Sequence, residues 1–489
     1  MFRAATIALL AAAVVASPAA ALKPTQEAPL GHEGRWVTDR KGRVVVLHGF
    51  NMVYKRPPYY PMHAGFGRND AKFLARNGFN TIRLGVIYAG VEPEPGQYDD
   101  AYLAKIAKTQ RVLARRGVYS LLDWHQDMYN ERFEGEGWPD WAVQDDGMPA
   151  EPKNGFPVNY LTMPALNRAF DHFWANDPGP EDVGLVDRYA AAYRHFAGRF
   201  KSMPGSLGYD LMNEPWPGSP WPSCASPEGC PTFDTGPLSE FTLKTITAIR
   251  EVDERSLAWY EPLLTFDFGA GTAHVDPEDA RAGFSFHIYC LPGAFGGAGG
   301  DDCETLEELP LENADARSEE TSDALLLTEF GATDDLVAIE RVARLADEHM
   351  VGWQEWHYCA CDEPTSQAAP DVQAIVIDPK KPPRGDNLKR AKLKVLSRPY
   401  PQVVAGTPKE WKFDTDEHVF DLTYETARAS GEGRFRRGLT DVFIPRFHFP
   451  DGYRVKAKGA SVVSRPNAKH LLLRGRRQAE TVTASVRPR

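Results

Sequence analysis

Short apolar segments alternate with amphipathic segments along most of the chain. The apolar segments predict strands at residues 44–47, 80–84, 118–123, 207–212, 257–261, 283–289, 324–329 and 351–356. Between them, apolar residues recur at helical spacing in residues 101–116, 183–200, 238–253 and 336–350. This alternation predicts an α/β fold, a (β/α)8 TIM barrel. An open doubly wound sheet is the second interpretation, and it is disfavoured because no glycine-rich phosphate loop follows the first strand.

The pattern changes after residue 397. Arg398-Pro399-Tyr400-Pro401 predicts a linker, and short alternating runs follow at residues 418–423, 440–444, 453–457, 461–463, 470–474 and 481–486. These runs predict a small all-β sandwich. We therefore expect a barrel at residues 22–397 and a sandwich domain at residues 398–489, with a structural role for the sandwich.

The first 21 residues have the pattern of a secretory signal peptide. Arg3 supplies a positive charge, residues 4–16 are apolar, and small residues at 19–21 suit cleavage. The apolar run is shorter than a permanent membrane span, and no later segment reaches about 20 apolar residues. We expect a secreted, soluble mature protein that begins near Leu22. An uncleaved anchor is the alternative.

The composition limits which classes of binding partner and which cellular compartment are expected. The chain has 489 residues, and its formal net charge of −11 argues against a nucleic-acid partner. Six cysteines suit a secreted protein with disulfides. They fall into three local pairs: Cys224 with Cys230, Cys290 with Cys303, and Cys359 with Cys361. The last pair could instead form free thiols or, with His357, a metal site; no metal site and no cofactor are predicted, because no second pair has zinc-site spacing.

Two predicted strands lead into glutamates. Residues 207–212 run into Asn213-Glu214-Pro215, and residues 324–329 end at Glu329. The C-terminal ends of barrel strands form the active site in this architecture. A pair of carboxylates there supplies the acid/base and the nucleophile that cleave a glycosidic bond. Either glutamate alone could simply end a strand.

Polar and aromatic residues also mark most other strand ends. The candidate substrate-binding residues are Arg83, Asp123, His125, Asn213, His287, Tyr289 and Trp356, together with Asn51 and Lys55 near the first strand. Each has a structural alternative, such as an internal ion pair for Arg83 or a core position for a histidine. Their gathering at one end of the barrel favours a binding site. Aromatics in the loops at residues 52–66, 129–159 and 216–235 would bind a sugar or an apolar tail, or pack on one another.

These residues resemble the active-site set of glycoside hydrolase family 5, and the chain is similar in particular to the endoglycoceramidases. The motifs that carry this resemblance are Gly49-Phe50-Asn51, Val91-Glu92-Pro93 with Pro95-Gly96 and Tyr98-Asp99, Leu122-Asp123-Trp124-His125-Gln126-Asp127, Tyr209-Asp210-Leu211-Met212-Asn213-Glu214-Pro215, Arg398-Pro399-Tyr400-Pro401 and Val404-Ala405-Gly406-Thr407-Pro408. The resemblance covers the barrel and the sandwich. It implies an enzyme that cuts the bond between oligosaccharide and ceramide in glycosphingolipids held in a membrane or micelle. It also implies transient membrane-surface contact and a monomer.

The resemblance implies a retaining mechanism with two displacements. Glu329 would be the nucleophile and Glu214 the acid/base, so Glu214 must hold a proton while Glu329 is ionised. The resemblance also implies supporting roles. Arg83 and Tyr289 would hold Glu329, Asn213 would donate to the sugar 2-hydroxyl, and Trp356 would form the floor under the sugar. Other sugar hydroxyls would be bound by Asp123, His125, Lys55 and Asn51, and His287 would orient its neighbours.

The last predicted strand departs from the resemblance. It reads Gln354-Glu355-Trp356-His357-Tyr358-Cys359, which differs from broad-specificity endoglycoceramidases, and the loop at residues 52–66 also differs. We therefore expect a divergent branch and favour endogalactosylceramidases, which prefer galactosylceramide-linked (6-gala series) glycans. The alternative enzyme is a β-1,4-glucanase or another polysaccharide hydrolase of the family. An inactive barrel that binds glycans is the alternative from another class.

Overall fold

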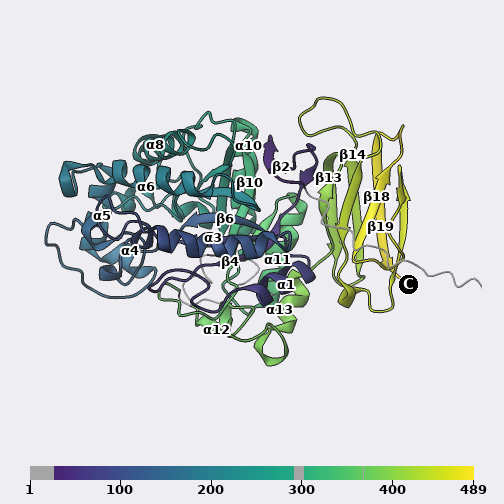
Figure 1. Ribbon diagram of the computed structural model, residues 1–489, viewed down its shortest axis with the longest axis horizontal. Coiled ribbons are helices and arrows are strands. Elements are labelled where there is room, and N and C mark those ends of the chain that lie inside the picture. Colours follow the sequence, from purple (N-terminus) through teal and green to yellow (C-terminus); the bar gives the residue numbers. More distant parts are fainter. Residues whose placement is uncertain (1–26, 291–301, 367) are drawn as a thin grey trace, which may run out of the picture.

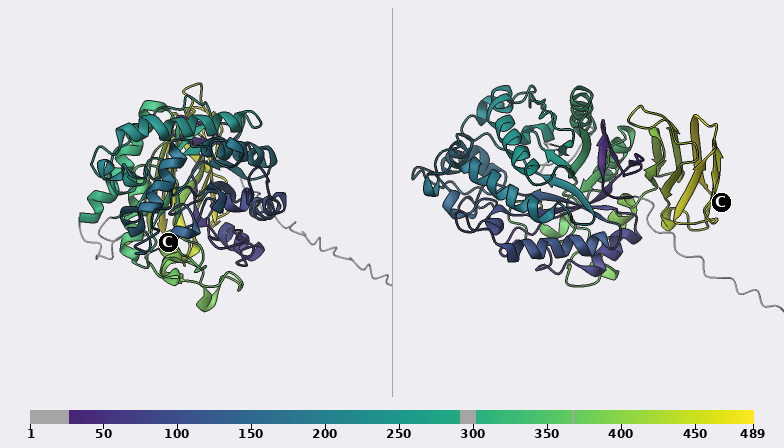
Figure 2. Two further views of the ribbon diagram at one scale, coloured as in Figure 1. Left: turned by 90° about the vertical axis from the view of Figure 1, so that its left-hand side faces the viewer. Right: turned by 45° about the horizontal axis from the view of Figure 1, so that its top comes forward.

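A computed structural model describes residues 27–290, 302–366 and 368–489 (Figure 1). The predicted signal peptide lies outside these residues. Within the described ranges, no helix is both long and apolar enough to cross a membrane. Two modules lie side by side, a helix-covered barrel and an all-β sandwich formed largely by the C-terminal part of the chain (Figure 2).

Eight parallel strands close into a barrel, as the alternation predicts. In chain order they are β4 (His48–Met52), β5 (Thr81–Val86), β6 (Tyr119–Trp124), β7 (Ser206–Asp210), β8 (Ala258–Tyr260), β9 (Ala282–Ile288), β10 (Ala324–Phe330) and β11 (Trp353–Glu355). Pairing of Trp353 with His48 closes the ring between β11 and β4. Both faces of these strands are covered, so their sequences are nearly continuous apolar runs.

Helices cover the outside of the barrel. They are α1 (Arg68–Arg76), α2 (Tyr88–Val91), α3 (Asp100–Ala114), α4 (Val158–Thr162), α5 (Pro164–Trp174), α6 (Leu185–Phe200), α7 (Pro231–Phe233), α8 (Ser239–Arg250), α10 (Asp302–Thr321), α11 (Leu336–Glu348), α12 (Pro370–Gln373) and α13 (Arg390–Leu396). The four predicted helices correspond to α3, α6, α8 and α11. Asp99 and Asp335 cap α3 and α11, because each carboxylate accepts two backbone N–H groups of the first turn.

The prediction of a barrel strand at residues 44–47 is wrong. Val44 and Val45 form β3 (Val44–Val45), which pairs with a strand of the sandwich. The barrel strand β4 begins at His48, three residues after Val45. Residues 44–52 are buried without interruption, so no periodicity marks where the chain leaves one sheet and enters the other.

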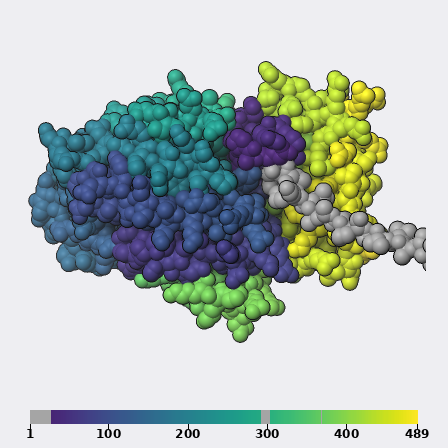
Figure 3. Space-filling model, viewed as in Figure 1, coloured from purple at the N-terminus to yellow at the C-terminus, as the bar shows by residue number. Residues whose placement is uncertain are grey.

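Two sheets form the sandwich. The first contains β1 (Gly31–Glu33), β2 (Trp36–Thr38), β3, β12 (Tyr400–Val404), β15 (Leu439–Phe443), β18 (His470–Gly475) and β17 (Ala460–Val462). The second contains β13 (Thr407–Asp414), β14 (Val419–Glu425), β19 (Thr481–Pro488) and β16 (Tyr453–Lys458). The six predicted strands of this module are therefore confirmed. Figure 3 shows the N-terminal strands, in dark purple, lying between the barrel and the sandwich.

The prediction of a linker at residues 398–401 is also wrong. Tyr400 and Pro401 begin β12, which pairs with β3 on one side and β15 on the other. The register shifts between Pro401 and Val403, so the ladder accommodates a residue that has no N–H to donate. Strands β12 and β13 were not predicted, because closely spaced prolines are more typical of a linker than of an inner strand.

Buried polar contacts join the two modules. Asp347 of α11 accepts a hydrogen bond from Trp411 Nε1 at 2.8 Å and pairs with Arg398 Nε at 3.0 Å. All three side chains are buried. Separation of the modules would break these contacts and expose the apolar core around Trp411.

All three predicted cysteine pairs are disulfides, Cys224–Cys230, Cys290–Cys303 and Cys359–Cys361. The alternatives of free thiols or a metal site at Cys359 and Cys361 are therefore wrong. The last disulfide lies directly after β11, at the start of the loop that leads to α12.

Candidate active site

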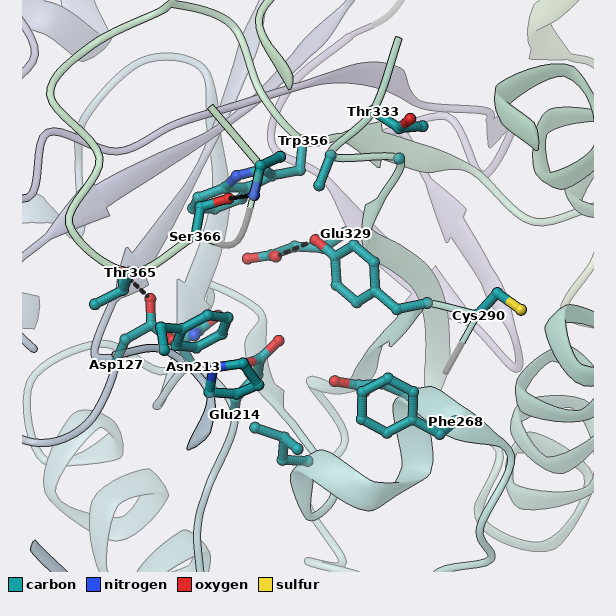
Figure 4. A pocket seen from close by; sticks show the side chains of 18 of the residues that line it. Asp127, Asn213, Glu214, Phe268, Cys290, Glu329, Thr333, Trp356, Thr365 and Ser366 are labelled. Atoms are coloured by element: carbon teal, nitrogen blue, oxygen red, sulfur yellow. Dashed lines mark hydrogen bonds between the residues drawn. The ribbon is translucent and has the colours of Figure 1, made fainter. Parts of the chain in front are cut away.

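Glu214 and Glu329 lie at one cavity at the C-terminal end of the barrel (Figure 4). Glu214 follows β7, and Glu329 is near the end of β10. The cavity has a volume of about 700 Å³. Parallel strands end at the same rim, so residues far apart in the sequence meet there.

His287 of β9 lies between the two glutamates. Its Nδ1 atom is 2.8 Å from Glu214 Oε1 and 3.8 Å from Glu329 Oε2. The sum of these distances is an upper limit on the separation of the two oxygens. That limit is compatible with the spacing of about 5–5.5 Å between the carboxyl groups of retaining glycosidases.

The backbone at Glu214 adopts a left-handed conformation, with φ of +42°. A residue with a side chain rarely occupies this region, and such residues gather at functional sites. Two contacts hold it: the Glu214 N–H donates to Glu261 Oε2 at 2.7 Å, and Gln126 Nε2 donates to the Glu214 carbonyl at 2.9 Å. The turn directs the carboxylate into the cavity.

Arg83 of β5 anchors Glu329 from below. Its Nη1 atom donates to Glu329 Oε1 at 2.5 Å, and its remaining nitrogens contact Asp210, Glu261, Asp123 and Asn213. The Tyr289 hydroxyl donates to the other oxygen of Glu329 at 2.9 Å. Both carboxylate oxygens of Glu329 are therefore fixed, which orients the carboxylate for attack.

Burial and charge act against each other in this cluster. Burial raises the pKa of Glu329 to about 7, although His287 and Arg83 oppose the shift. Burial alone would lower the pKa of His287, but Glu329 and Glu261 raise it well above its usual value. His287 is therefore a cation that can donate to Glu214. Glu261 stays ionised, since His287 and Arg83 hold its pKa at about 2 in spite of burial.

A second group of buried charges borders the cavity beside Trp356. Lys55 Nζ donates to Asp127 Oδ2 at 2.5 Å and to Thr365 Oγ1 at 2.7 Å, and it pairs with Glu363 at 2.9 Å. It also lies 4.6 Å from the centre of the Trp356 ring. Burial lowers the pKa of Lys55, but the carboxylates around it raise it well above its usual value. This end of the cavity offers fixed donors and acceptors to sugar hydroxyls.

Apolar side chains line other parts of the cavity. Its lining includes Phe156, Leu161, Trp216, Trp221, Leu264 and Phe268. These residues come from α4, from the loop after β7 and from the short helix η6 (Leu264–Phe268). The predicted aromatic loops thus supply one wall of the cavity. Its length and chemistry suit a ligand that is polar at one end and apolar at the other.

Within the described ranges, three sets of side chains are close enough to hold a cation. They are Cys290 with Cys303 and Glu307, His125 with Asp127 and Glu136, and Glu214 with Asp267 and His287. In the first set the cysteines are bonded to each other, and in the second the Lys55 ammonium already neutralises Asp127. In the third, the ring of His287 already contacts both acidic groups, at 2.8 Å from Glu214 and 3.8 Å from Asp267. The donor chemistry of these sets is therefore that of internal ion pairs and a disulfide.

Two family models match the chain. "Cellulase (glycosyl hydrolase family 5)" matches residues 39–362, and "Glycoside hydrolase family 5 C-terminal domain" matches residues 398–487.

The chain belongs to glycoside hydrolase family 5. It is therefore a glycosidase, with a scaffold that places two carboxylates at strand ends.

Among curated members of the family, endoglycoceramidase I of Rhodococcus hoagii is 34% identical over 454 residues, which cover 89% of this chain and 84% of that protein. The solved structure of endo-glycoceramidase II from Rhodococcus sp. in complex with ganglioside GM3 has a TM-score of 0.73 at 28% identity, covering 93% of this chain and 99% of that one. An endogalactoceramidase crystal structure has a TM-score of 0.70 at 22% identity, which shows a shared fold.

The predicted site residues occupy two layers of this family 5 site. Those that line the cavity are Lys55, His125, Asn213, Glu214, Tyr289, Glu329 and Trp356. Asn51, Arg83, Asp123 and His287 lie behind them and are fully buried. Asp123 pairs with Arg83 and with His125 Nδ1, at 3.1 and 2.8 Å, so its carboxylate faces protein rather than the cavity. The side chain of Asn213 accepts from Arg83 Nη2 and donates to the Gln126 carbonyl.

Sequence reasoning missed several members of the site. Glu261 ends a predicted strand, and that position was a usable signal. Asp127 stood within a quoted motif without a role. Asp267, Glu363 and Thr365 lie in loops, where no periodic pattern marks them. Asp267 is buried beside the acid/base, and its Oδ2 atom lies 3.8 Å from His287 Nδ1 without a hydrogen-bond partner among the described residues.

Proposed function

We propose that the protein is a retaining endo-glycosidase that hydrolyses the bond between oligosaccharide and ceramide in glycosphingolipids. One observation carries the proposal: the two glutamates line a single cavity that also contains fixed charged groups and a set of aromatic and aliphatic side chains. A glycosphingolipid has this polarity, and its scissile bond lies where the two halves meet. The endoglycoceramidase relatives support the same substrate class.

The first step is a displacement at the anomeric carbon. Glu329 attacks this carbon while Glu214 donates a proton to the departing oxygen of ceramide, so the glycosidic bond breaks and a covalent glycosyl-enzyme forms. In the second step Glu214 removes a proton from water, which attacks the same carbon and releases Glu329. Two inversions retain the anomeric configuration.

His287 and Arg83 control the protons and charges of these steps. Arg83 and Tyr289 hold the two oxygens of Glu329, so one geometry serves both attack and release. The His287 Nδ1–H contacts the carboxylate that gives up its proton, and stabilises it as it becomes charged. The proton then returns when Glu214 activates water.

The leaving-group side of the cavity suits ceramide. Asp267 lines the cavity next to Glu214, and its Oδ2 atom has no hydrogen-bond partner among the described residues. A carboxylate oxygen there suits the amide N–H or hydroxyl of ceramide beside the scissile bond. Beyond it, Trp221, Leu264 and Phe268 offer apolar surface to the two tails.

We further propose a preference for galactosylceramide-linked glycans. Residues 354–359 depart from broad-specificity endoglycoceramidases, and Glu363 and Thr365, a few residues further along, contact Lys55 beside Trp356. Glucose and galactose differ in the orientation of one hydroxyl group. A change in the residues around Lys55 can therefore change which of the two sugars the site prefers.

Export and a monomeric state are proposals as well. Three disulfides suit an oxidising compartment, in agreement with the expected signal peptide. N-terminal sequencing of protein recovered from culture medium tests the export, with a start near Leu22 expected. Light scattering of the same sample tests the monomer. A chain retained in cells with its first residues intact, or a defined dimer, would contradict the respective proposal.

The deciding experiment offers the purified protein two glycosphingolipids in detergent, one linked through glucosylceramide and one through galactosylceramide. Mass spectrometry is expected to show intact oligosaccharide and free ceramide from both, with the galactosyl substrate faster. The Glu329→Gln variant is the control for contaminating hydrolases. Release of single sugars, or turnover of a β-1,4-glucan alone, would overturn the proposal. Glycan binding without turnover would favour the inactive barrel.

A further inference from the structure

A second cavity, of about 630 Å³, lies outside the catalytic site on the flank of the barrel. It is lined by α1, by residues 382–388, by α13 and by Phe447 of the short helix η8 (Arg446–His448) in the sandwich. Figure 1 shows α1 and α13 next to each other at the lower edge of the molecule. We call this cavity the basic groove, because five cationic side chains line it: Lys72, Arg76, Arg384, Arg390 and Lys394.

All charged side chains that line the basic groove are positive. Its lining contains no aspartate or glutamate, although the chain as a whole carries a net charge of −11. All five cations are exposed, and none of them forms an ion pair with a carboxylate in the described part of the chain. Unpaired like charges in one concave surface produce a local positive potential that attracts anions.

Two further cations extend the positive surface onto the sandwich. Lys469 Nζ donates to the Arg76 carbonyl at 2.9 Å, and Arg446 precedes Phe447. Burial, together with the charges of Arg76 and Arg446, lowers the pKa of Lys469. The mutual effect of these cations shows that the positive surface continues across the junction of the two modules.

The floor and edge of the basic groove are apolar. Phe73 and Leu393 are buried in its floor, while the ring of Phe447 is 38% exposed at its edge. Cations around an apolar floor, with an exposed aromatic ring, match the boundary between charged headgroups and acyl chains in a bilayer. A single small anion would need no such floor.

We propose that the basic groove docks the protein onto bilayers that contain anionic phospholipids. The five cations belong to two helices and a loop, and they are all exposed. This spread suits an array of headgroups rather than one bound anion. The inference rests on the proposed function, since a bilayer is where the enzyme would meet a glycosphingolipid.

The groove is connected to the catalytic cavity by one segment of chain. Ser366, Ala368 and Val372 line the catalytic cavity, and Arg384, Arg390 and Lys394 line the basic groove a short distance further along. Lys389 Nζ donates to the Asp371 carbonyl and pairs with Asp334 after β10, so this segment is fixed against the barrel rim. The two cavities share no lining residue, so substitutions in the basic groove leave the catalytic lining unchanged.

The test measures sedimentation of the full chain with phosphatidylcholine vesicles, with and without phosphatidylglycerol and without any glycolipid. Wild-type protein is expected to bind the anionic vesicles, with affinity that falls as salt rises. The double variant Arg390→Glu/Lys394→Glu should weaken this binding by at least about tenfold. The matched control, Lys456→Glu/Lys458→Glu, changes the charge equally at exposed positions of β16 and should bind like wild type.

Equal binding to neutral and anionic vesicles, or equal loss in both double variants, would overturn the docking proposal. Full release by soluble glycerol phosphate would also overturn it, because the groove would then be a site for a single anion. The vesicles contain no substrate, so these results do not depend on whether the protein cleaves glycosphingolipids. If it does, the ratio of the rate on anionic vesicles to the rate in detergent micelles should fall in the groove variant.

Discussion

Glu329 is the residue on which the chemistry of this site depends most. Its two oxygens are held by different donors, Arg83 and Tyr289, and its charge is balanced against burial. A carboxylate in this position has little freedom to rotate, so attack on the anomeric carbon requires little reorganisation. Its protonation state then decides whether the enzyme is active.

The pH dependence of activity should report this balance. Burial raises the pKa of Glu329 to about 7, so the carboxyl group is protonated, and unable to attack, below that pH. We therefore expect kcat/KM to rise with pH and to level off above about 7. The profile is measured on a soluble aryl glycoside, which avoids the effects of pH on micelles. An acid limb centred near the usual glutamate value of about 4.3 would contradict this assignment.

Glu214 can be tested by the choice of leaving group. Glu214→Gln removes the proton that a ceramide alcohol needs, so hydrolysis of a glycosphingolipid should slow by about 10²–10⁴-fold. An aryl glycoside with an acidic phenol needs no such proton, so its release should be affected much less. Stopped-flow measurement of phenol release follows the aryl glycoside, and mass spectrometry of free ceramide follows the glycosphingolipid. Equal losses on both substrates would remove Glu214 from the acid/base role, whereas Glu329→Gln should lose both activities.

At the scale of elements, Lys55 connects three loops of the catalytic end. It follows β4 and contacts Asp127 after β6 and Glu363 and Thr365 after β11. Asp127 and Thr365 also share a hydrogen bond of 2.8 Å. The wall of the sugar end is thus held by one buried cation.

Removal of that cation should destabilise the fold. Lys55→Met would leave three buried acidic groups, those of Asp127, Glu136 and Glu363, without this partner. We expect a loss of about 3–5 kcal/mol in the free energy of unfolding. Denaturant unfolding followed by fluorescence measures the change. Lys381→Met is the matched control, because the Lys381 side chain is 70% exposed in its pair with Asp378, and its replacement should change stability by less than about 0.5 kcal/mol. Similar values for both variants would contradict a structural role of Lys55.

Buried strands could be predicted from the sequence, and their boundaries could be predicted only where burial ends. The strand predicted at residues 324–329 matches β10 within one residue, because apolar residues give way to the polar turn at Gly331. At residues 44–52 burial continues from β3 of the sandwich into β4 of the barrel. The boundary between the two strands therefore could not be predicted. The linker prediction at residues 398–401 was wrong for the opposite reason. Prolines are typical of linkers, but here they belong to a strand that is paired on both sides.

The sequence predicts those site residues that lie in strands or just after them. Glu214, Glu329 and Arg83 were found because each stands in or directly after a buried strand. Asp267 and Thr365 were missed, because their positions depend on loop conformation. The division between residues that line the cavity and residues behind them also needed the structure. Asp123 stands at a strand end like Glu329, but its two oxygens face Arg83 and His125, and it does not line the cavity.

At the scale of the molecule, the barrel and the sandwich should unfold together. They share the segment from β3 to β4, and the buried contacts of Asp347 with Trp411 and Arg398 join them further. Calorimetry should therefore show one transition rather than two. A chain that ends at residue 397 would leave β3 unpaired and apolar residues exposed, and we expect it to be insoluble. A soluble, folded truncated barrel or two separate transitions would contradict this coupling.

The pairing of β3 with β12 also has a consequence for biosynthesis. The strands made first, β1 to β3, wait for partners that are among the last to leave the ribosome, because the entire barrel is encoded between them. Until then the sheet has an open edge, which is a template for aggregation and a target for proteases. A chain whose synthesis stops early cannot close this edge. Closure of the sheet thus distinguishes complete chains from interrupted ones.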